Sequence, residues 1–322
     1  MQTGSEIPGD GGQTAREGHG GKPRLGYVGI GLMGLPMTRR LLARGYAVTV
    51  CDLVEARAEE ARAAGATVAA TPAQAAQHAD LVLLNLPTTD AVGQVVFGDQ
   101  GLASALRPPQ LVVDFSTVKV DVGRAFAARL RESTGCGWVD APVSGGPPAC
   151  AAGTLTVMAG GDEADLERVR PLMTDIAGRF TAMGPSGAGS TAKMINQLIV
   201  GCTHAVMAEA VVLAESAGID AGRIPECLAG GYADSSMLQK LYPRIVARDF
   251  APQGYARQLL KDLEMLSEFG AGLKSPMPMA GQALSLYRML VHLGYSELDT
   301  AAVYKLYEPV GDRQAPDPGT TR

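Results

Sequence analysis

The chain has 322 residues, which is enough for two packed domains with a sizeable core. Hydrophobic residues make up 46% and charged residues 19%, a balance that excludes an intrinsically disordered chain. The formal net charge is −5 and no basic run is clustered, so nucleic acid is not expected as a partner.

Cysteines, histidines and apolar runs narrow the class further. The five scattered cysteines form no CxxC pair, which argues against a disulfide framework and a zinc site and favours a reducing cytoplasm. No histidines have HExxH spacing, so we expect no metal. We also expect no membrane partner, because no continuous apolar run reaches the roughly 18 residues that span a bilayer.

The two ends of the chain differ in composition from the rest. Residues 1–22 are rich in glycine and lack the apolar core of a secretory signal, so we interpret them as a flexible tail. We interpret residues 311–322 as a loose C-terminal tail.

From Arg24 onward, short apolar segments alternate with helical patterns. The predicted strands cover residues 25–30, 46–50, 81–86, 111–115, 137–140, 154–159 and 179–183. Helices are predicted up to Leu42, over residues 53–64, and after Asp162. Continuous apolar strands between helices are typical of a parallel sheet that is covered on both faces.

Near Pro185 the alternation ends. One long apolar-rich helix is predicted from Ala188 to about Ser216, followed by helices that turn signals interrupt. We therefore predict an α/β domain over residues 23–186 and an all-α domain over residues 187–310.

The first strand leads into a glycine-rich loop that is typical of a dinucleotide site. Gly29 permits the tight turn, Gly31 lets the backbone approach a pyrophosphate, and Gly34 packs the helix close to the strand. The whole loop is predicted to bind the cofactor, and its residues are Gly29, Ile30, Gly31, Leu32, Met33 and Gly34. A glycine-rich packing turn without a ligand is the alternative.

Asp52 closes the second strand, 18 residues after Gly34. A carboxylate there accepts hydrogen bonds from the adenine ribose hydroxyls and repels a 2′-phosphate. No arginine follows immediately to bind such a phosphate. The sequence therefore predicts NAD as the cofactor, with NADP less favoured.

Four ordered motifs resemble the β-hydroxyacid dehydrogenase family, which includes 3-hydroxyisobutyrate dehydrogenase and 2-hydroxy-3-oxopropionate (tartronate semialdehyde) reductase. The motifs are GIGLMGLPM at residues 29–37, DAPVSGG at 140–146 with GTLT at 153–156, GAGSTAKMINQ at 187–197, and the pair Lys261-Asp262. Together they cover nearly all of residues 24–310. The resemblance implies that residues 23–186 form a Rossmann-type domain that binds NAD, and that residues 187–310 form an all-α domain for substrate binding and dimerisation.

This resemblance assigns roles to individual residues. It implies that Lys193 carries the proton during hydride transfer, and a lysine can do so where burial or positive charge lowers its pKa. It places the substrate carboxylate at the loop after the fifth predicted strand, whose residues are Ser144, Gly145 and Gly146. Asn196 and Gln197 project from the same side of the helix as Lys193, and which amide contacts substrate stays open.

Cofactor contacts are expected from three further places. Leu86 and Pro87 close one strand, and Thr117 follows another, where ligands gather in open α/β sheets. Lys261 is expected to reach the cofactor or substrate from the helical domain. The alternative for Lys261 is a surface position with an ion pair to Asp262 or Glu264.

The main hypothesis is an oxidoreductase that interconverts a small β-hydroxy acid and its semialdehyde with NAD. The partner is then a small substrate that bears a carboxylate, and the resemblance implies a homodimer or homotetramer. One alternative is a relative with another substrate, such as L-threonate, L-serine or sulfolactaldehyde. Another is a dinucleotide-binding sensor without catalysis. Imine-reducing relatives usually replace this lysine, so the presence of Lys193 argues against them. A 6-phosphogluconate-type enzyme is less favoured, because the sequence shows no candidate phosphate pocket.

Overall fold

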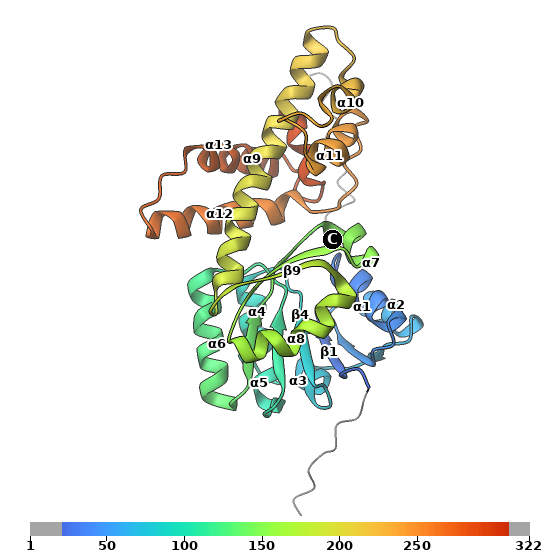
Figure 1. Cartoon of the computed structure of the whole chain (residues 1–322), viewed down its shortest axis with the longest axis vertical. Helices are drawn as coiled ribbons and strands as arrows, with labels where there is room; N and C mark the ends of the chain where they lie inside the picture. Colours follow the sequence, from blue (N-terminus) through green and yellow to red (C-terminus); the bar gives the residue numbers. More distant parts are fainter. Residues whose placement is uncertain (1–20, 309–322) are drawn as a thin grey trace, which may run out of the picture.

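The structure is a computed structural model, and it describes residues 21–308. Figure 1 shows a domain built on a sheet and, above it, a group of helices. Helix α9 (Ala188–Ser216) runs from the sheet into the helical group. The tail predicted at 311–322, and all but the last two residues of the tail predicted at 1–22, lie outside the described residues.

The sheet has nine strands, and most of it is parallel. Strands β3, β2, β1, β4, β5 and β6 pair side by side in that order, all parallel. Their bounds are β1 Leu25–Val28, β2 Val48–Cys51, β3 Thr67–Val68, β4 Leu81–Leu84, β5 Leu111–Asp114 and β6 Gly137–Asp140. Since these strands are parallel, the loops that follow them meet at one edge of the sheet.

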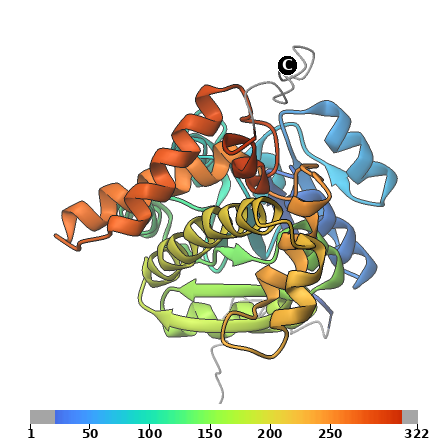
Figure 2. The same cartoon turned by 90° about the horizontal axis from the view of Figure 1, so that it is seen from above.

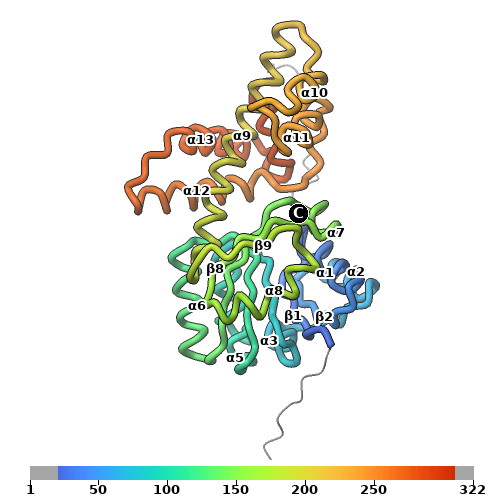
Figure 3. Tube along the Cα trace, viewed as in Figure 1, coloured from blue at the N-terminus to red at the C-terminus, as the bar shows by residue number. Residues whose placement is uncertain are grey.

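Alternate residues of these strands enter two separate cores, one on each face of the sheet. Tyr27 and Val113 belong to one core, and Val28 and Trp138 belong to the other. This confirms the expectation of a sheet that is covered on both faces. Figure 3 traces the crossovers through the helices α1 Gly34–Ala43, α2 Glu55–Ala63, α3 Pro72–Ala76, α4 Thr89–Phe97, α5 Leu102–Ala105 and α6 Val120–Thr134.

The last strands depart from the predicted parallel order. β8 (Leu155–Gly160) runs antiparallel to β6 and to the short β7 (Val143–Ser144). Between β6 and β8 the chain contains only β7 and the short helix α7 (Gly146–Ala152). A helix that short does not carry the chain back across the sheet, so β8 returns in the opposite direction. Helix α8 (Glu163–Ile176) then restores a parallel crossover to β9 (Ala177–Gly184), a largely exposed strand.

The second domain is helical, as the sequence predicted. Its elements after α9 are η1 Ala221–Arg223, α10 Ile224–Leu228, α11 Ser236–Val246, α12 Ala256–Gly272, α13 Pro278–His292 and η2 Thr300–Leu306. Figure 2 shows α9 between the α12–α13 pair on one side and α10–α11 on the other. Their apolar faces form one core that includes Val211, Tyr242, Leu263 and Tyr287.

The central position of α9 explains its apolar composition. By length and hydropathy alone α9 would also be able to cross a membrane, and it is the one such helix among residues 21–308. In the structure 44% of its most apolar window is buried inside the protein. A core helix of a globular protein satisfies the same two criteria, so this finding alone is weak evidence for a membrane span.

Candidate active site

The loop between β1 and α1 has the shape that a dinucleotide requires. Gly29 has a φ of +87°, and a Cβ there would lie 2.4 Å from the Asn85 carbonyl oxygen. A Cβ at Gly34 would lie 2.3 Å from the Gly29 carbonyl oxygen, so any side chain would push α1 away from the turn. At Gly31 the nearest atom would be an Arg57 nitrogen at 3.7 Å, which leaves the backbone open to a ligand. The loop therefore fits a bound dinucleotide pyrophosphate.

Asp52 lies beside this loop, at the end of β2. Its Oδ2 accepts a hydrogen bond of 2.7 Å from the Ile30 backbone N–H, and its Oδ1 accepts one of 2.8 Å from the Val54 N–H. The side chain of Ile30 is fully buried, so this residue meets a cofactor through its backbone. Arg57 Nη1 lies 3.7 Å from Asp52 Oδ1. The sequence reasoning missed this arginine, because it searched only the residues directly after Asp52.

The loops after β4 and β5 are tied together at the same sheet edge. The Ser116 hydroxyl accepts a 2.8 Å hydrogen bond from the Leu86 N–H, and the Ser116 N–H donates to the Asp114 carboxylate. This bond holds Leu86 and Pro87 next to Thr117. The three residues predicted to bind the cofactor from these loops therefore lie together.

Lys193 lies in the second turn of α9 and is almost fully buried, with 8% of its surface exposed. Its Nζ donates a 2.9 Å hydrogen bond to the Val143 carbonyl oxygen, directly before Ser144. Burial lowers the pKa of Lys193 to about 8; the charge of Asp262 opposes this shift and that of Lys261 adds to it. A lysine with such a pKa can both accept and return a proton near neutral pH.

Two carboxylates lie side by side on neighbouring strands, and one of them contacts the start of α9. Asp140 accepts 2.8 Å hydrogen bonds from the backbone N–H groups of Gly187 and Ser190. These groups are orphan donors at the start of α9, so Asp140 caps the helix that carries Lys193. Asp114 pairs with Asp140 in the strand register, and burial raises its pKa to about 7.

The two amides after Lys193 take different positions. Gln197 is buried, and its Nε2 donates a 2.5 Å hydrogen bond to Asp262 Oδ2. Asn196 is half-buried, and its Nδ2 donates to Gln197 Oε1. Gln197 is thus held by α12, and Asn196 is hydrogen-bonded to Gln197. Lys261 Nζ lies 3.1 Å from Asp262 Oδ1 and donates to the Thr117 carbonyl oxygen at 3.0 Å.

The structure changes one detail of the predicted carboxylate site. Ser144 belongs to β7 and Gly146 begins α7, where the sequence suggested a plain loop. Gly145 and Gly146 both have positive φ, at +127° and +68°. A Cβ at Gly146 would lie 3.7 Å from the Gln253 carbonyl oxygen, so the segment before α12 borders this site. Sequence reasoning did not single out Gln253.

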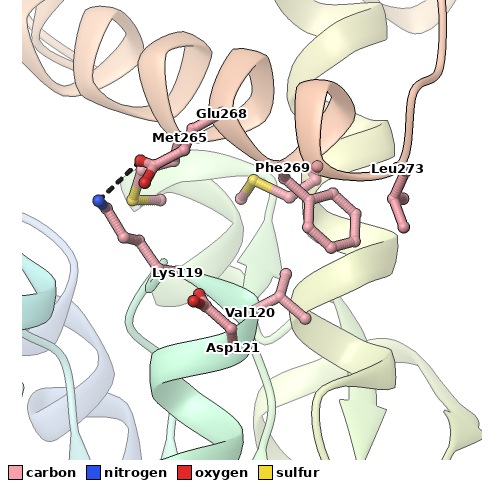
Figure 4. A pocket seen from close by; sticks show the side chains of 9 residues that line it. Lys119, Val120, Asp121, Met265, Glu268, Phe269 and Leu273 are labelled. Carbon is pink, nitrogen blue, oxygen red and sulfur yellow. Dashed lines mark ion pairs between the residues drawn. The ribbon is translucent and has the colours of Figure 1, made fainter.

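The two domains contact each other along α12. One contact is the Lys261 bond to Thr117. A second comes from Gln258: with its amide turned so that the oxygen accepts from Arg257, its nitrogen donates to the Pro87 carbonyl oxygen at 3.2 Å. Farther along α12, the ion pair between Lys119 and Glu268 joins the domains at 2.7 Å beside a pocket of about 320 Å³, as Figure 4 shows. No predicted site residue lines this pocket. The candidate site therefore lies at the strand ends, between the sheet and α9.

A metal centre has no obvious place in this arrangement. Among residues 21–308, no group of three or more His, Cys, Asp or Glu side chains lies close enough together to hold a metal ion.

Comparison with known proteins decides the family. Residues 24–184 match the NAD-binding domain of 6-phosphogluconate dehydrogenase, and residues 187–307 match the NAD-binding domain described for NADP-dependent 3-hydroxyisobutyrate dehydrogenase. The chain is 36% identical to an NAD-dependent L-serine dehydrogenase of Pseudomonas aeruginosa, over 89% of this chain and 98% of that protein. It belongs to the β-hydroxyacid dehydrogenase family.

Further members of this family differ in their substrates. A 2-hydroxy-3-oxopropionate reductase of Escherichia coli is 33% identical, over 88% of this chain and 97% of that protein. The structure of Mycobacterium tuberculosis 3-hydroxyisobutyrate dehydrogenase with L-serine matches with a TM-score of 0.80 and 30% identity, over 89% of this chain and 99% of that one. The chain is therefore an oxidoreductase that uses NAD, on the two-domain fold of its relatives.

Proposed function

We propose that this protein interconverts a small β-hydroxy acid and its semialdehyde, with Lys193 as the proton carrier. The observation that carries the proposal is the bond from Lys193 Nζ to the Val143 carbonyl oxygen. It holds the amine one residue from Ser144, where the substrate carboxylate would bind. In a β-hydroxy acid only one carbon atom lies between the carboxylate and the carbon that bears the hydroxyl. A carboxylate bound at Ser144 would therefore bring the hydroxyl close to the Lys193 amine.

The chemistry divides between the cofactor and the chain. NAD supplies the hydride acceptor when it is bound. During oxidation Lys193, as the free amine, takes the hydroxyl proton, and during reduction its ammonium form returns that proton. Ser144, Gly145 and Gly146 would bind the carboxylate through a hydroxyl and backbone N–H groups.

Asn196 is the amide that we assign to the substrate. Its neighbour Gln197 is buried and already donates to Asp262, so Gln197 has a holding role within the helical domain. Asn196 is half-buried, and its amide nitrogen is used by Gln197, which leaves its carbonyl oxygen to accept from the substrate hydroxyl.

The proposal includes a preference for NAD over NADP, because the Asp52 carboxylate stands where the adenine ribose would bind. We also propose that the protein is cytoplasmic and forms a homodimer or homotetramer. Support for the location comes from the five cysteines, which are all free. Support for assembly comes from large exposed apolar side chains along α9, which are Ile195, Ile199, Val206 and Leu213.

A substrate panel tests the function. We would offer 3-hydroxyisobutyrate, glycerate, L-serine, L-threonate and 3-hydroxypropionate with NAD, and measure NADH formation by the native protein and by Lys193→Ala. We expect turnover of at least one acid, and its loss in the variant while NADH still binds. Tight NADH binding without turnover of any acid would overturn the proposal and favour a dinucleotide sensor.

A further inference from the structure

The part of the cofactor site that would bind the adenine ribose carries a positive charge from a residue outside the sequence motif. Arg57 lies in the first turn of α2, five residues after Asp52. Its Nη1 is 3.7 Å from Asp52 Oδ1, and it is also the nearest atom, at 3.7 Å, to a Cβ placed on Gly31. The guanidinium therefore lies between the ribose carboxylate and the pyrophosphate loop.

The Asp52 carboxylate is already engaged at both oxygens. Ile30 and Val54 donate to it from the backbone, and Arg57 lies beside it as a counter-charge. The local charge of the acid and the guanidinium together is close to zero. A neutral pair repels a 2′-phosphate far less than an isolated carboxylate does.

The space around Arg57 is open. Leu53, between Asp52 and α2, is fully exposed, and the Arg57 side chain is 45% exposed, so both can move aside for a ligand. Other arginines near α2 are paired elsewhere: Arg39 with Glu60 at 2.9 Å, and Arg62 with Glu59. Glu55 in the same turn is exposed.

We infer that Arg57 sets how strongly this chain discriminates between NAD and NADP, by binding the 2′-phosphate when the cofactor carries one. With NAD, Arg57 stays beside Asp52, whose carboxylate accepts from the ribose hydroxyls. With NADP, the guanidinium turns from Asp52 to the phosphate, to which it donates charge-assisted hydrogen bonds. The chain then uses NAD by preference but still binds NADP.

Equilibrium binding of NADH and NADPH tests this inference without any hydroxy acid. Titration calorimetry on the native protein, Arg57→Ala, Asp52→Asn and the double variant gives eight dissociation constants. We expect the native protein to bind NADPH no more than about 100-fold more weakly than NADH. Arg57→Ala should weaken NADPH binding by about 10-fold, the effect of one lost charge-assisted contact, and NADH binding by less than about 3-fold.

The double variant gives the sharper result. Asp52→Asn should tighten NADPH binding by about 10-fold or more, since the guanidinium is then free for the phosphate. In the Asp52→Asn background, where no carboxylate is left for Arg57 to neutralise, Arg57→Ala should still weaken NADPH binding by about 10-fold and NADH binding by less than about 3-fold. An equal loss for both cofactors, or no loss for either, would show that Arg57 does not read the 2′ position.

Arg62→Ala is the matched control, because Arg62 lies on the same helix and pairs with Glu59 on the surface. It should leave the ratio of the two dissociation constants unchanged. An equal effect of Arg57→Ala and Arg62→Ala would reduce the role of Arg57 to general surface charge and overturn the inference. Both outcomes are independent of whether the hydroxy acid is turned over.

Discussion

At the scale of single residues, the proton-transfer proposal makes a pH prediction. Burial sets the pKa of Lys193 at about 8. Oxidation requires the free amine, so kcat/KM for the hydroxy acid should rise with pH and level off above about 8. Reduction requires the ammonium form, so its kcat/KM should fall above about 8. Steady-state rates across this range check both, and identical profiles in the two directions would contradict the assignment.

The two amides of α9 give a second residue-scale prediction. Asn196→Ala should lower kcat/KM for the hydroxy acid by about 10-fold, the cost of a lost hydrogen bond in a buried site, without changing NADH affinity. Gln197→Ala removes the bond to Asp262 and should lower the melting temperature more than Asn196→Ala does. Kinetics and thermal unfolding of both variants separate the roles. The reverse pattern would assign the substrate to Gln197.

Sequence reasoning predicted most residues of the candidate site but not their partners. Lys193, Ser144 and the glycines of the first loop were predicted because each lies in a motif with fixed spacing. Arg57 and Gln253 carried no such signal, since only the folded chain brings them next to Asp52 and Gly146.

At the scale of elements, the seating of α9 on the sheet determines where Lys193 lies. Asp140→Asn keeps one acceptor for the two N–H groups that Asp140 now caps. A small shift of α9 should lower kcat by about 10- to 100-fold while NADH affinity stays the same, because the glycine loop is at another strand. Kinetics on folded protein, with NADH titration, check this.

Asp165→Asn is the control for the loss of a buried acid. Asp165 lies on α8, where it pairs with Arg131 and Arg168 away from α9. It should lower the melting temperature without lowering kcat. If Asp140→Asn behaves in the same way, Asp140 serves stability alone.

The accuracy of the element predictions follows from the strength of the local patterns. The long helix begins and ends as predicted, at Ala188 and Ser216, since its apolar pattern is continuous. The sheet was predicted as parallel, and β1 to β6 confirm this, whereas β8 and its neighbour β9 run in the opposite direction. Apolar periodicity reports that a strand is buried and carries no information on its direction.

At the scale of the whole molecule, two lysines join the domains in different ways. Lys261 reaches the Thr117 carbonyl oxygen from a largely buried position, whereas Lys119 pairs with Glu268 at the surface. Lys261→Ala should weaken NADH binding by about 10-fold, because the loop of Thr117 loses a charge-assisted bond. Lys119→Ala should change the free energy of unfolding little, because the pair is exposed to solvent, and should leave binding intact. Calorimetry and denaturant unfolding measure both effects, and equal losses of binding would contradict this distinction.

The arrangement of the domains was beyond the reach of sequence patterns. Composition and alternation separated a sheet domain from a helical one, but the contacts of α12 with Pro87 and Thr117 depend on how the two pack. Such contacts between distant segments have no period or spacing that a single sequence displays.

The most direct test of the central claim follows one hydrogen atom. The hydroxy acid that the panel identifies as substrate would carry deuterium on its hydroxyl carbon. The mass of the NADH formed would be measured by mass spectrometry. The native protein should place the deuterium in NADH, and Lys193→Ala should do so about 10²- to 10⁴-fold more slowly with NADH affinity retained. Unlabelled NADH, or a variant as fast as the native protein, would contradict hydride transfer with Lys193 as the proton carrier.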